Sequence, residues 1–391
     1  MKNNTLDNFC NITTGKLDAN QAVVGGEYPF YTCSEHPGTT DSFAFDDNVV
    51  LIAGNNAKGN FHVNRFKGKF NAYQRTYVLT AKNKVCINYI YYILKLELKR
   101  LKEKSQGSQT KFLTMPILNS IALRDLDFNK QESISNVLNR LDEKIALNKL
   151  INTELEAMTK LIYDYWFVQF DFPDENGKPY KSSGGKMVYN EELKREIPEG
   201  WRVKELREIE PNIVTGKTPS TTNPENFGGA VPFICIGDVR ENMHITKTEE
   251  TLSKSGADSQ FKKYVPKDAI CVTCIASPGL VGFATEASQT NQQLNTIVCN
   301  DVNNRYFLYF YLKDYFRFAK AKSGNTFANM NKDDFSSIKS IRPTEDILKS
   351  FSNTLEPSLD KILINSKENN KLAELRDWLL PMLMNGQVTV N

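Results

Sequence analysis

The longest regular pattern of apolar positions in the chain covers residues 129–166, which contain neither proline nor glycine. Apolar residues recur there alternately four and three positions apart, with asparagines at intermediate positions. The positions that follow the pattern are Ile134, Leu138, Leu141, Ile145, Asn148, Asn152, Leu155 and Ile162. This spacing is typical of the seam of a coiled coil. At ~1.5 Å per residue the helix would be on the order of 57 Å long, so we expect it to pack against a partner helix.

A second stretch near the C-terminus repeats this pattern and supplies the expected partner. It contains Leu359, Ile362, Asn365, Asn369, Leu372 and Leu379. At one constant offset along the chain, the matching seam positions are Ile145 and Ile362, Asn148 and Asn365, Asn152 and Asn369, and Leu155 and Leu372. The chain is therefore predicted to be internally duplicated, with its two long helices paired antiparallel as a coiled coil.

Two roles are open for the four asparagines of this seam. An amide at a seam position costs stability but fixes the register when it hydrogen-bonds an amide of the partner helix. Alternatively, these side chains lie at the rim of the seam, in contact with water. One residue of rotation about the helix axis decides between the two arrangements, so the sequence leaves both open.

The segments that precede the two helices also correspond to each other. The recurring pieces are ITTGK (12–16) and IVTGK (213–217), YPF (28–30) and VPF (231–233), the helical patterns 88–101 and 306–321, and Gly107 and Gly324. Short β-rich runs alternate with polar loops in both segments. Each half is therefore predicted to be one mixed domain followed by one long helix.

The predicted fold class is α+β, with two mixed α/β domains, two long helices and a pseudo-twofold internal repeat. A run rich in Gly, Ser, Pro and Lys after the first helix is interpreted as a connector on the surface. The expected boundaries are 1–125 for the first domain, 126–170 for the central helix, 171–200 for the connector, 201–343 for the second domain and 344–391 for the C-terminal helix.

Composition places the chain among globular proteins. It has 391 residues, of which 40% are hydrophobic and 24% charged, so two or three domains are expected. No apolar run is long enough for a membrane-spanning helix, and the N-terminal stretch lacks the apolar core of a signal peptide. We therefore expect no membrane association and a cytoplasmic location. The seven cysteines are interpreted as reduced core thiols, because their number is odd and they are scattered through apolar segments.

Charge is unevenly distributed, although the net charge is only +3. No acidic residue occurs between Asp47 and Glu97, whereas eight Lys or Arg residues do. Aromatic residues such as Phe66, Phe70 and Tyr73 are interleaved with these positive charges. This combination favours nucleic acid over a membrane surface, because no helical apolar face accompanies the charge. A solvated basic surface without a partner is the alternative.

Motifs for catalysis and for metal binding are incomplete. The Gly216-Lys217-Thr218 run has Pro211 where a Walker A loop needs glycine, and no adenine-methyltransferase Asn-Pro-Pro-aromatic motif occurs. Cys271 and Cys274 form a single CxxC without further ligands, so alternation on a core strand explains them better than zinc. Glu192-Leu193-Lys194 resembles half of a nuclease motif but is interpreted as a solvated helix start. We expect no catalytic site and no metal in this chain.

Polar residues in loops of both halves are candidates for reading or holding DNA. Asn and Gln suit adenine, Arg and Lys suit guanine, and lysines also bind phosphates. The candidates are Lys16, Asn55, Asn56, Lys58, Lys67, Lys69, Asn71, Gln74, Arg75, Lys217, Thr218, Ser277, Asn291, Gln292, Gln293 and Lys322. For any single Asn or Gln, capping of a turn is the competing role.

Several of these motifs together resemble a known family. The features are the ITTGK and IVTGKTP openings, the YPFYTCSE and VPFICIGD strands, the helix LDEKIALNKLINTELEAMTKLIYDYWF and the run from FDFP to IPEGW. The chain resembles, over its whole length, the specificity subunit of a type I restriction-modification enzyme.

The resemblance implies a subunit without catalysis or bound cofactor. Each domain would be a target-recognition domain that reads one half of a bipartite double-stranded DNA target, and the helices would set the spacer and dock two methylation subunits. Restriction subunits with translocase and nuclease activity would join this core. S-adenosylmethionine, ATP and Mg would belong to the partner subunits, which methylate adenine N6 and cleave DNA.

Two other functions are alternatives to this one. The chain is alternatively a non-catalytic protein-interaction scaffold with only non-specific affinity for DNA, which would fall steeply with salt. A solitary methyltransferase with a duplicated recognition arm is disfavoured, because the sequence lacks a motif for S-adenosylmethionine.

Overall fold

The computed structural model describes residues 4–240, 242–323 and 329–390. It divides into a first unit, Met1–Lys144 with Leu372–Asn391, and a second unit, Ile145–Lys371. The chain has two long helices, α4 (Phe128–Tyr163) and α10 (Glu345–Asn385). Each of them is divided between the units, with one segment in the first unit and one in the second. Each unit combines these segments with its own sheet and shorter helices, so the predicted mixed fold with two long helices is confirmed.

The first unit is built on a six-stranded sheet with the order β1-β7-β4-β6-β2-β3. Its strands are β1 (Cys10–Thr14), β2 (Tyr28–Tyr31), β3 (Gly38–Thr40), β4 (Phe45–Ala53), β6 (Val63–Ala72) and β7 (Thr76–Ala81). All pairs are antiparallel except β2 with β6. The shorter elements are α1 (Leu6–Phe9), η1 (Ala19–Gln21), β5 (Asn55–Asn56), β8 (Lys111–Phe112) and α3 (Met115–Asn119).

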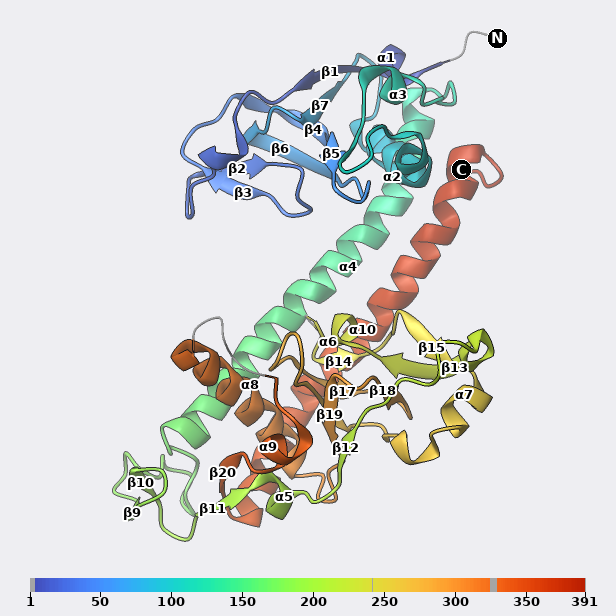
Figure 1. The fold of residues 1–391 in the computed structure, drawn as a ribbon. Coiled ribbons are helices and arrows are strands. Elements are labelled where there is room, and N and C mark those ends of the chain that lie inside the picture. The colour runs from blue at the N-terminus through green and yellow to red at the C-terminus, as the bar shows by residue number, and fades with distance from the viewer. Residues whose placement is uncertain (1–3, 241, 324–328, 391) are drawn as a thin grey trace. The chain divides into compact units, whose positions relative to one another are not determined.

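Both faces of the central strand β4 are buried, which explains its continuous apolar run. Helix α2 (Ile87–Lys104) covers one face of the sheet, where Val50 and Ile52 belong to the same core as Tyr92 of the helix (Figure 1). Val49 and Leu51 point to the opposite face and join a smaller cluster. Alternation of neighbouring residues between two cores is the expected consequence of the strand's two-residue period.

The helix segments of the first unit pack against this sheet domain. Leu138 of α4 and Leu383 of α10 lie in the core that α2 covers. Asp142 on α4 accepts hydrogen bonds from the Tyr92 hydroxyl (2.8 Å) and from Arg376 Nη1 on α10 (2.9 Å). One carboxylate therefore ties α2, α4 and α10 together.

The second unit contains a five-stranded sheet, β12-β19-β16-β17-β14, and a three-stranded sheet, β15-β13-β18. The strands are β12 (Ile213–Thr215), β13 (Phe227–Ile234), β14 (His244–Ile245), β15 (Glu250–Leu252), β16 (Ile270–Thr273), β17 (Val281–Ala284), β18 (Gln289–Thr290) and β19 (Leu294–Ile297). Two further pairs are β9 (Met187–Asn190) with β10 (Arg195–Pro198) and β11 (Arg202–Glu205) with β20 (Lys339–Arg342). The helices are α5 (Leu206–Ile209), α6 (Ile236–Val239), α7 (Lys254–Asp258), α8 (Asn304–Ser323) and α9 (Lys332–Ser336).

Helix α8 covers the five-stranded sheet as α2 covers the sheet of the first unit. Phe283 of β17 stacks on Tyr309 of α8, with ring centroids 4.8 Å apart. Beyond α4, the π-helical turn η2 (Asp164–Val168) brings Phe167 against Phe351 of α10 and Phe307 of α8. Aromatic contacts therefore join the helix pair to the core of this unit.

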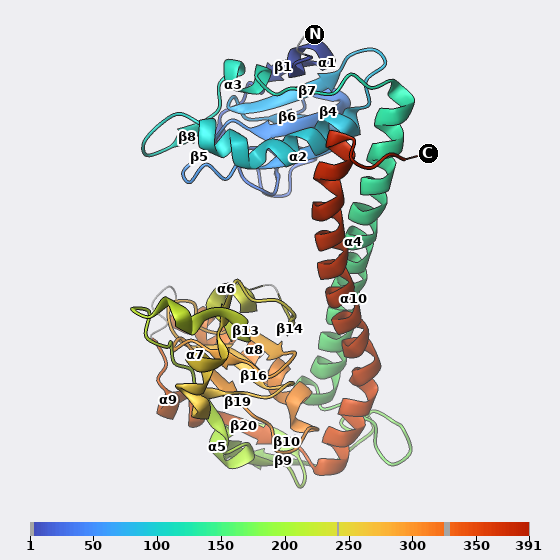
Figure 2. The same cartoon turned by 90° about the vertical axis from the view of Figure 1, so that its right-hand side faces the viewer.

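Within the second unit, α4 and α10 run antiparallel (Figure 2). Asparagines of the two helices contact each other. The Nδ2 of Asn148 donates to Asn369 Oδ1 (3.0 Å), and the Nδ2 of Asn365 donates to Asn152 Oδ1 (2.8 Å). Asn148 and Asn365 are buried. Of the two roles open from the sequence, the contacts correspond to hydrogen bonding between amides of the two helices. Ile362 is also buried, whereas Ile145, Leu155 and Leu372 are half-buried.

Residues 171–200, predicted to be a connector on the surface, are mostly exposed but include residues that are buried in a core. This segment contains the β9–β10 hairpin, and its Phe172 and Ile197 are buried in the main core of the second unit beside Trp201. Isolated apolar residues among many polar ones anchor this segment to the core. Their spacing matches neither the period of a helix nor that of a strand, so the sequence pattern did not indicate their burial. Glu192 and Leu193 lie in the hairpin turn, where their amides donate to Asn190 Oδ1, so the predicted helix start is wrong.

Candidate nucleic-acid interface

In the first unit, a loop after β1 and the turn between β6 and β7 form one end of the sheet. The Gly15 amide donates to the Thr76 carbonyl (3.1 Å), and a Cβ at Gly15 would collide with the carbonyl of Ala72. Only glycine permits this approach without displacement of the turn. The exposed Lys16 therefore lies directly beside the β6–β7 turn.

Side-chain and backbone contacts hold the residues at the tip of this turn. Gln74 Nε2 donates to Asp18 Oδ1 in the loop after β1 (2.7 Å). The Arg75 carbonyl accepts from the Gly54 amide (2.8 Å), which brings the loop at 54–60 to the same place. Gln74 and Arg75 are both exposed. Three segments thus converge at one end of the sheet, with Lys16 and Arg75 supplying positive charge.

The loop at 54–60 contains three further candidates. Asn56 Oδ1 accepts from the amides of Lys58 (2.9 Å) and Asn60 (3.0 Å), so this side chain caps its own turn. Asn55 pairs with Phe112 across β5 and β8 and is half-buried. Lys58 is exposed. Of the three, only Lys58 presents its side chain freely to solvent.

The second unit builds the same arrangement from the corresponding residues. The Gly216 amide donates to the Leu294 carbonyl (3.1 Å), and a Cβ there would collide with the Asn291 carbonyl. This places the exposed Lys217 beside the turn between β18 and β19. The Thr218 hydroxyl donates to Gln292 Oε1 (2.5 Å). This contact corresponds to the Gln74–Asp18 hydrogen bond of the first unit, although there the glutamine is the donor.

A third segment meets the turn here as well. The Gln293 carbonyl accepts from the Cys274 amide (2.8 Å), just as the Arg75 carbonyl accepts from Gly54. The loop that follows Cys274 contains the half-buried Ser277, whose carbonyl accepts from the Thr273 hydroxyl (2.6 Å). The loop that contains Ser277 therefore corresponds to the loop at 54–60 of the first unit.

Strand register defines the correspondence between the two turns residue by residue. The parallel pairs are Phe30 with Asn71 and Tyr31 with Ala72 in the first unit, and Phe233 with Gln289 and Ile234 with Thr290 in the second. Ala72 therefore corresponds to Thr290. Counted onward from this pair, Gln74 corresponds to Gln292, and Arg75 to Gln293.

Two predicted candidates, Asn71 and Asn291, have side chains that are buried and hydrogen-bonded inside the fold. Asn71 is 2% exposed, and its Nδ2 donates to the Ser42 carbonyl (3.3 Å). Its counterpart Gln289 is fully buried and donates to the Ala257 carbonyl (2.7 Å). Asn291 is 8% exposed, and its Oδ1 accepts from the Gln293 amide (3.0 Å). These amides brace the turns, which is the competing role of amides in loops.

The remaining lysine candidates lie elsewhere. Lys67 and Lys69 are exposed on β6 and not in the turn, and Lys69 Nζ lies 4.7 Å from the centre of the Phe43 ring. Lys322 lies in the last turn of α8, but its side chain and the predicted repeat glycine Gly324 are outside the described residues. Within each unit the structure therefore brings some candidates together at the turn, and it leaves Lys67 and Lys69 apart from the turn of the first unit.

A loop that was not predicted from the sequence contacts Lys217. Gln260 Nε2 donates to the Lys217 carbonyl (2.7 Å) and to Gln289 Oε1 (2.7 Å). The next residue, Phe261, is 70% exposed, and the exposed Lys262 follows it. An aromatic residue beside two consecutive lysines is the signal that identifies this loop, and it is the same signal that marked the basic segment of the first half.

The thiols of Cys271 and Cys274 are buried, and neither belongs to a metal cluster within the described residues. Across residues 4–240, 242–323 and 329–390, no cluster of three His, Cys, Asp or Glu residues fits a metal ion. Burial raises the pKa of Cys271 to about 12 and that of Cys274 to about 11, so both thiols stay protonated at neutral pH. The Cys271-Cys274 pair therefore has the properties of core residues.

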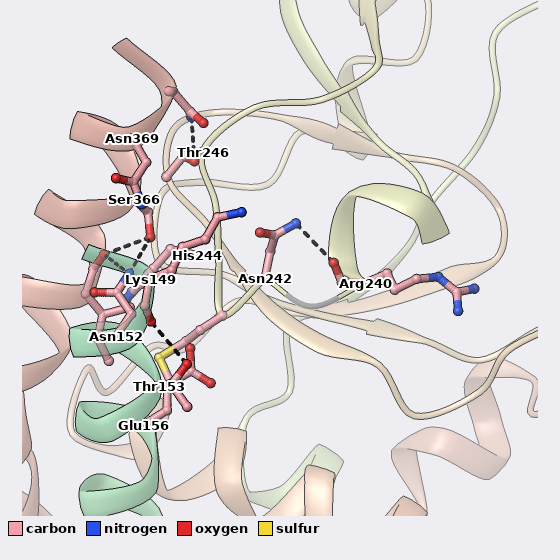
Figure 3. A pocket seen from close by; sticks show the side chains of 13 residues that line it. Lys149, Asn152, Thr153, Glu156, Arg240, Asn242, His244, Thr246, Ser366 and Asn369 are labelled. Carbon is pink, nitrogen blue, oxygen red and sulfur yellow. Dashed lines mark hydrogen bonds between the residues drawn. The ribbon is translucent and has the colours of Figure 1, made fainter. Parts of the chain in front are cut away.

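A polar pocket of about 470 Å³ lies beside the helix pair of the second unit (Figure 3). Asn152 and Asn369 line it from the helices, and His244 and Thr246 line it from the segment around β14. Asn370 Nδ2 donates to the Thr246 hydroxyl (2.8 Å), and His244 Nε2 lies 3.2 Å from the Leu359 carbonyl. Burial lowers the pKa of His244 to about 4, so the imidazole is neutral at pH 7. These contacts hold β14 against α10.

Comparison with known proteins decides the family. The model of the type I restriction modification DNA specificity domain matches twice, at residues 1–157 and 198–374, which together make up more than half of the chain. The chain belongs to this family. The two matches confirm the predicted duplication. Type I specificity subunits are non-catalytic, and the function of the chain is accordingly the DNA sequence specificity of a type I restriction-modification system.

Individual relatives agree with the family model. The specificity subunit of the type I restriction enzyme HindI from Haemophilus influenzae is 33% identical over 333 residues, which cover 71% of each chain. The MjaIX specificity subunit from Methanocaldococcus jannaschii is 27% identical over 328 residues, covering 80% of this chain and 71% of that one. The crystal structure of a type I S subunit from M. genitalium has a TM-score of 0.61 at 16% identity, covering 97% of this chain and 95% of that one, and thus shares the fold.

Of the described helices, none is both long and apolar enough to cross a membrane.

Proposed function

We propose that each unit of this specificity subunit reads one half of a bipartite double-stranded DNA target. The observation that carries the proposal is the repeated arrangement in which a glycine-lysine loop contacts a turn between two strands, with Lys16 in one unit and Lys217 in the other. Two copies of one binding arrangement suit two half-sites. In this proposal residues 1–125 and 201–343 are the target-recognition domains, and 171–200 joins the first helix to the second domain.

The lysines of the two loops are proposed to contact DNA phosphates. Lys16 and Lys217 are exposed at equivalent positions, and Lys58 adds a charge in the first unit. Phosphate contacts carry no sequence information, so identical residues in both units fit this role. Lys67 and Lys69 remain proposed as further phosphate contacts at the exposed surface of β6.

The two long helices, assigned to residues 126–170 and 344–391, are proposed to set the spacer and to dock two methylation subunits. Large apolar residues are exposed on α4 at Leu147, Met158 and Leu161. At the offset that relates the two seams, α10 exposes Ile364, Leu375 and Trp378. Exposed apolar residues at heptad-like spacing can pack against another helix. The three residues on each helix form one apolar stripe. Because each helix has one such stripe, we propose that each helix docks one methylation subunit.

The catalytic chemistry of the complex is proposed to belong to other chains. S-adenosylmethionine would be held by the methylation subunits, which transfer its methyl group to adenine N6. ATP and Mg would be used by restriction subunits that translocate and cleave DNA. This chain would contribute recognition and assembly, without a bound cofactor of its own.

Co-expression tests the proposal. The full chain is expressed with its presumed methylation subunit in a host that lacks other adenine methylation, and methylated adenines are located by single-molecule sequencing of the genome. We expect one bipartite motif with a fixed spacer and a methylated adenine on each strand. Methylation without a motif, or a motif confined to one contiguous site, would contradict the proposal of two reading units.

A further inference from the structure

The tips of the two equivalent turns differ in sequence although corresponding segments of the two units hold them. We propose that these tips, Gln74-Arg75 and Gln292-Gln293, are the base-reading positions of the two units, and that the base facing Arg75 is guanine. This inference rests on the proposed function and assigns the reading of each half-site to particular side chains.

The fixed backbone of each tip is the first argument. Three contacts hold the turn of the first unit: the close approach of Gly15, the Gln74–Asp18 hydrogen bond and the Gly54–Arg75 hydrogen bond. The second unit has the corresponding contacts through Gly216, Thr218 and Cys274. Recognition groups must be held within a narrow range of positions, and a pinned turn fulfils that requirement.

The comparison between the units supplies the second argument. Lys16 and Lys217 are identical at equivalent positions, whereas Arg75 corresponds to Gln293. Contacts that every half-site needs, such as those to phosphate, are expected to be the same in both units. Contacts that distinguish one half-site from the other are expected to differ. The tip position at which Arg75 is replaced by Gln293 is therefore the one expected to distinguish the two half-sites.

Hydrogen-bonding capacity supplies the third argument. Among the residues that the structure describes, none is a hydrogen-bonding or ionic partner of the exposed Arg75 guanidinium. Its parallel N–H groups fit the O6 and N7 acceptors of guanine. Gln74 commits its Nε2 to Asp18, which leaves Oε1 to accept from the exocyclic amine of adenine or cytosine. In the second unit, Gln292 and Gln293 each accept at Oε1 from a neighbouring side chain, which leaves their NH2 groups as donors to a base edge.

A reciprocal exchange of the corresponding residues tests the assignment. The complex of the full chain with its methylation subunit is purified with Arg75→Gln, with Gln293→Arg and with the control Lys67→Gln, and each selects from duplexes randomised in both half-sites. We expect Arg75→Gln to reduce the preference for guanine at one position of the first half-site by about five- to 150-fold, because a bidentate base contact has that worth. The second half-site should stay unchanged.

The other two variants complete the test. Gln293→Arg should create a guanine preference at one position of the second half-site and leave the first unaltered, whereas Lys67→Gln should weaken binding to all sequences alike. An unchanged motif with Arg75→Gln would overturn the inference, as would an equal loss of preference in both half-sites. Both results leave the bipartite motif of the unmodified chain in place, so they are distinguishable from a failure of the proposed function.

Loss of all binding by Arg75→Gln is resolved by a second measurement. Competition with duplexes that match only the second half-site reports whether that unit still binds with its own preference. If it does, the first tip alone is damaged and the inference stands. If it does not, the variant has disturbed more than the first half-site, and the assignment of Arg75 to base reading is wrong.

Discussion

The Asn148–Asn369 amide contact on α4 and α10 is a copy of the Asn365–Asn152 contact. At the offset that relates the two seams, Asn148 corresponds to Asn365, and Asn152 corresponds to Asn369. The Nδ2–Oδ1 distances are 3.0 Å for Asn148–Asn369 and 2.8 Å for Asn365–Asn152. The duplication of the chain thus creates a twofold-related pair of amide contacts within the seam. Such contacts fix register, because any slide of one helix breaks both.

Removal of one amide from this pair should destabilise the second unit. Asn148→Ala deprives both Asn369 and the carboxylate of Glu368 of a donor, since Asn148 Nδ2 contacts both. We expect the free energy of unfolding to fall by about 1–3 kcal/mol, because two hydrogen bonds are lost and one of them is to a carboxylate. Denaturant titration followed by circular dichroism measures it. The control Glu154→Ala, at an exposed position of the same helix, should change it by less than about 0.5 kcal/mol.

A methyl group at Gly216 should displace the loop that carries Lys217. The added Cβ would collide with the Asn291 carbonyl, which belongs to a backbone that cannot rotate away. Gly216→Ala is therefore expected to cost about 1–3 kcal/mol of unfolding free energy and to weaken selection at the second half-site. Gly237→Ala is the control, because its Cβ would meet nothing within 4 Å. Equal behaviour of both variants would contradict the close packing of the loop on the turn.

A carboxylate in one apolar stripe should remove one methylation subunit. Leu161→Asp and Trp378→Asp change exposed residues that are equivalent in the repeat, with exposed fractions of 66% and 56%. Each variant should fold normally and bind one methylation subunit in place of the two we propose, which native mass spectrometry counts directly. Lys349→Asp, at an exposed position of α10, should retain both. Retention of both subunits by Leu161→Asp would place the docking surface elsewhere.

Acid should destabilise the second unit through His244. Burial lowers the pKa of this imidazole to about 4, below its ordinary value of 6.5. The unfolded chain therefore binds a proton at this imidazole more readily than the folded chain does. The contribution of the neutral, buried His244 to folding stability is complete above pH 6.5 and is lost as the pH falls toward 4. Over that interval His244→Gln should reduce the pH dependence of the unfolding free energy by about 1.4 kcal/mol per pH unit.

The histidine of an exposed loop provides the control for this effect. His36 is exposed in the first unit, so His36→Gln should leave the pH dependence of the second unit unchanged. The measurement is a series of denaturant titrations between pH 4 and pH 7, followed by a probe in the second unit such as the buried Trp201. An unaltered slope in His244→Gln would show that other groups govern the acid sensitivity.

Much of this protein follows from the sequence by itself. The long helices follow from apolar spacing, and the duplication follows from offsets between matching residues, because both are properties of local order along the chain. Strands such as β4 follow from runs like Val49 to Ile52, which strongly favour extended structure. The family follows from motifs that occur in both halves. None of these predictions depends on which distant residues meet.

Only the tertiary structure decided which polar side chains are available. Asn71 and Gln74 are close neighbours in one basic segment, yet one is buried against Ser42 and the other is exposed at a turn. The equivalence of Arg75 with Gln293 comes from the pairing of β2 with β6 and of β13 with β18, strands that are distant in sequence. Exposure and register depend on these long-range pairings, and a one-residue change in register would move every side chain of a strand to the opposite face.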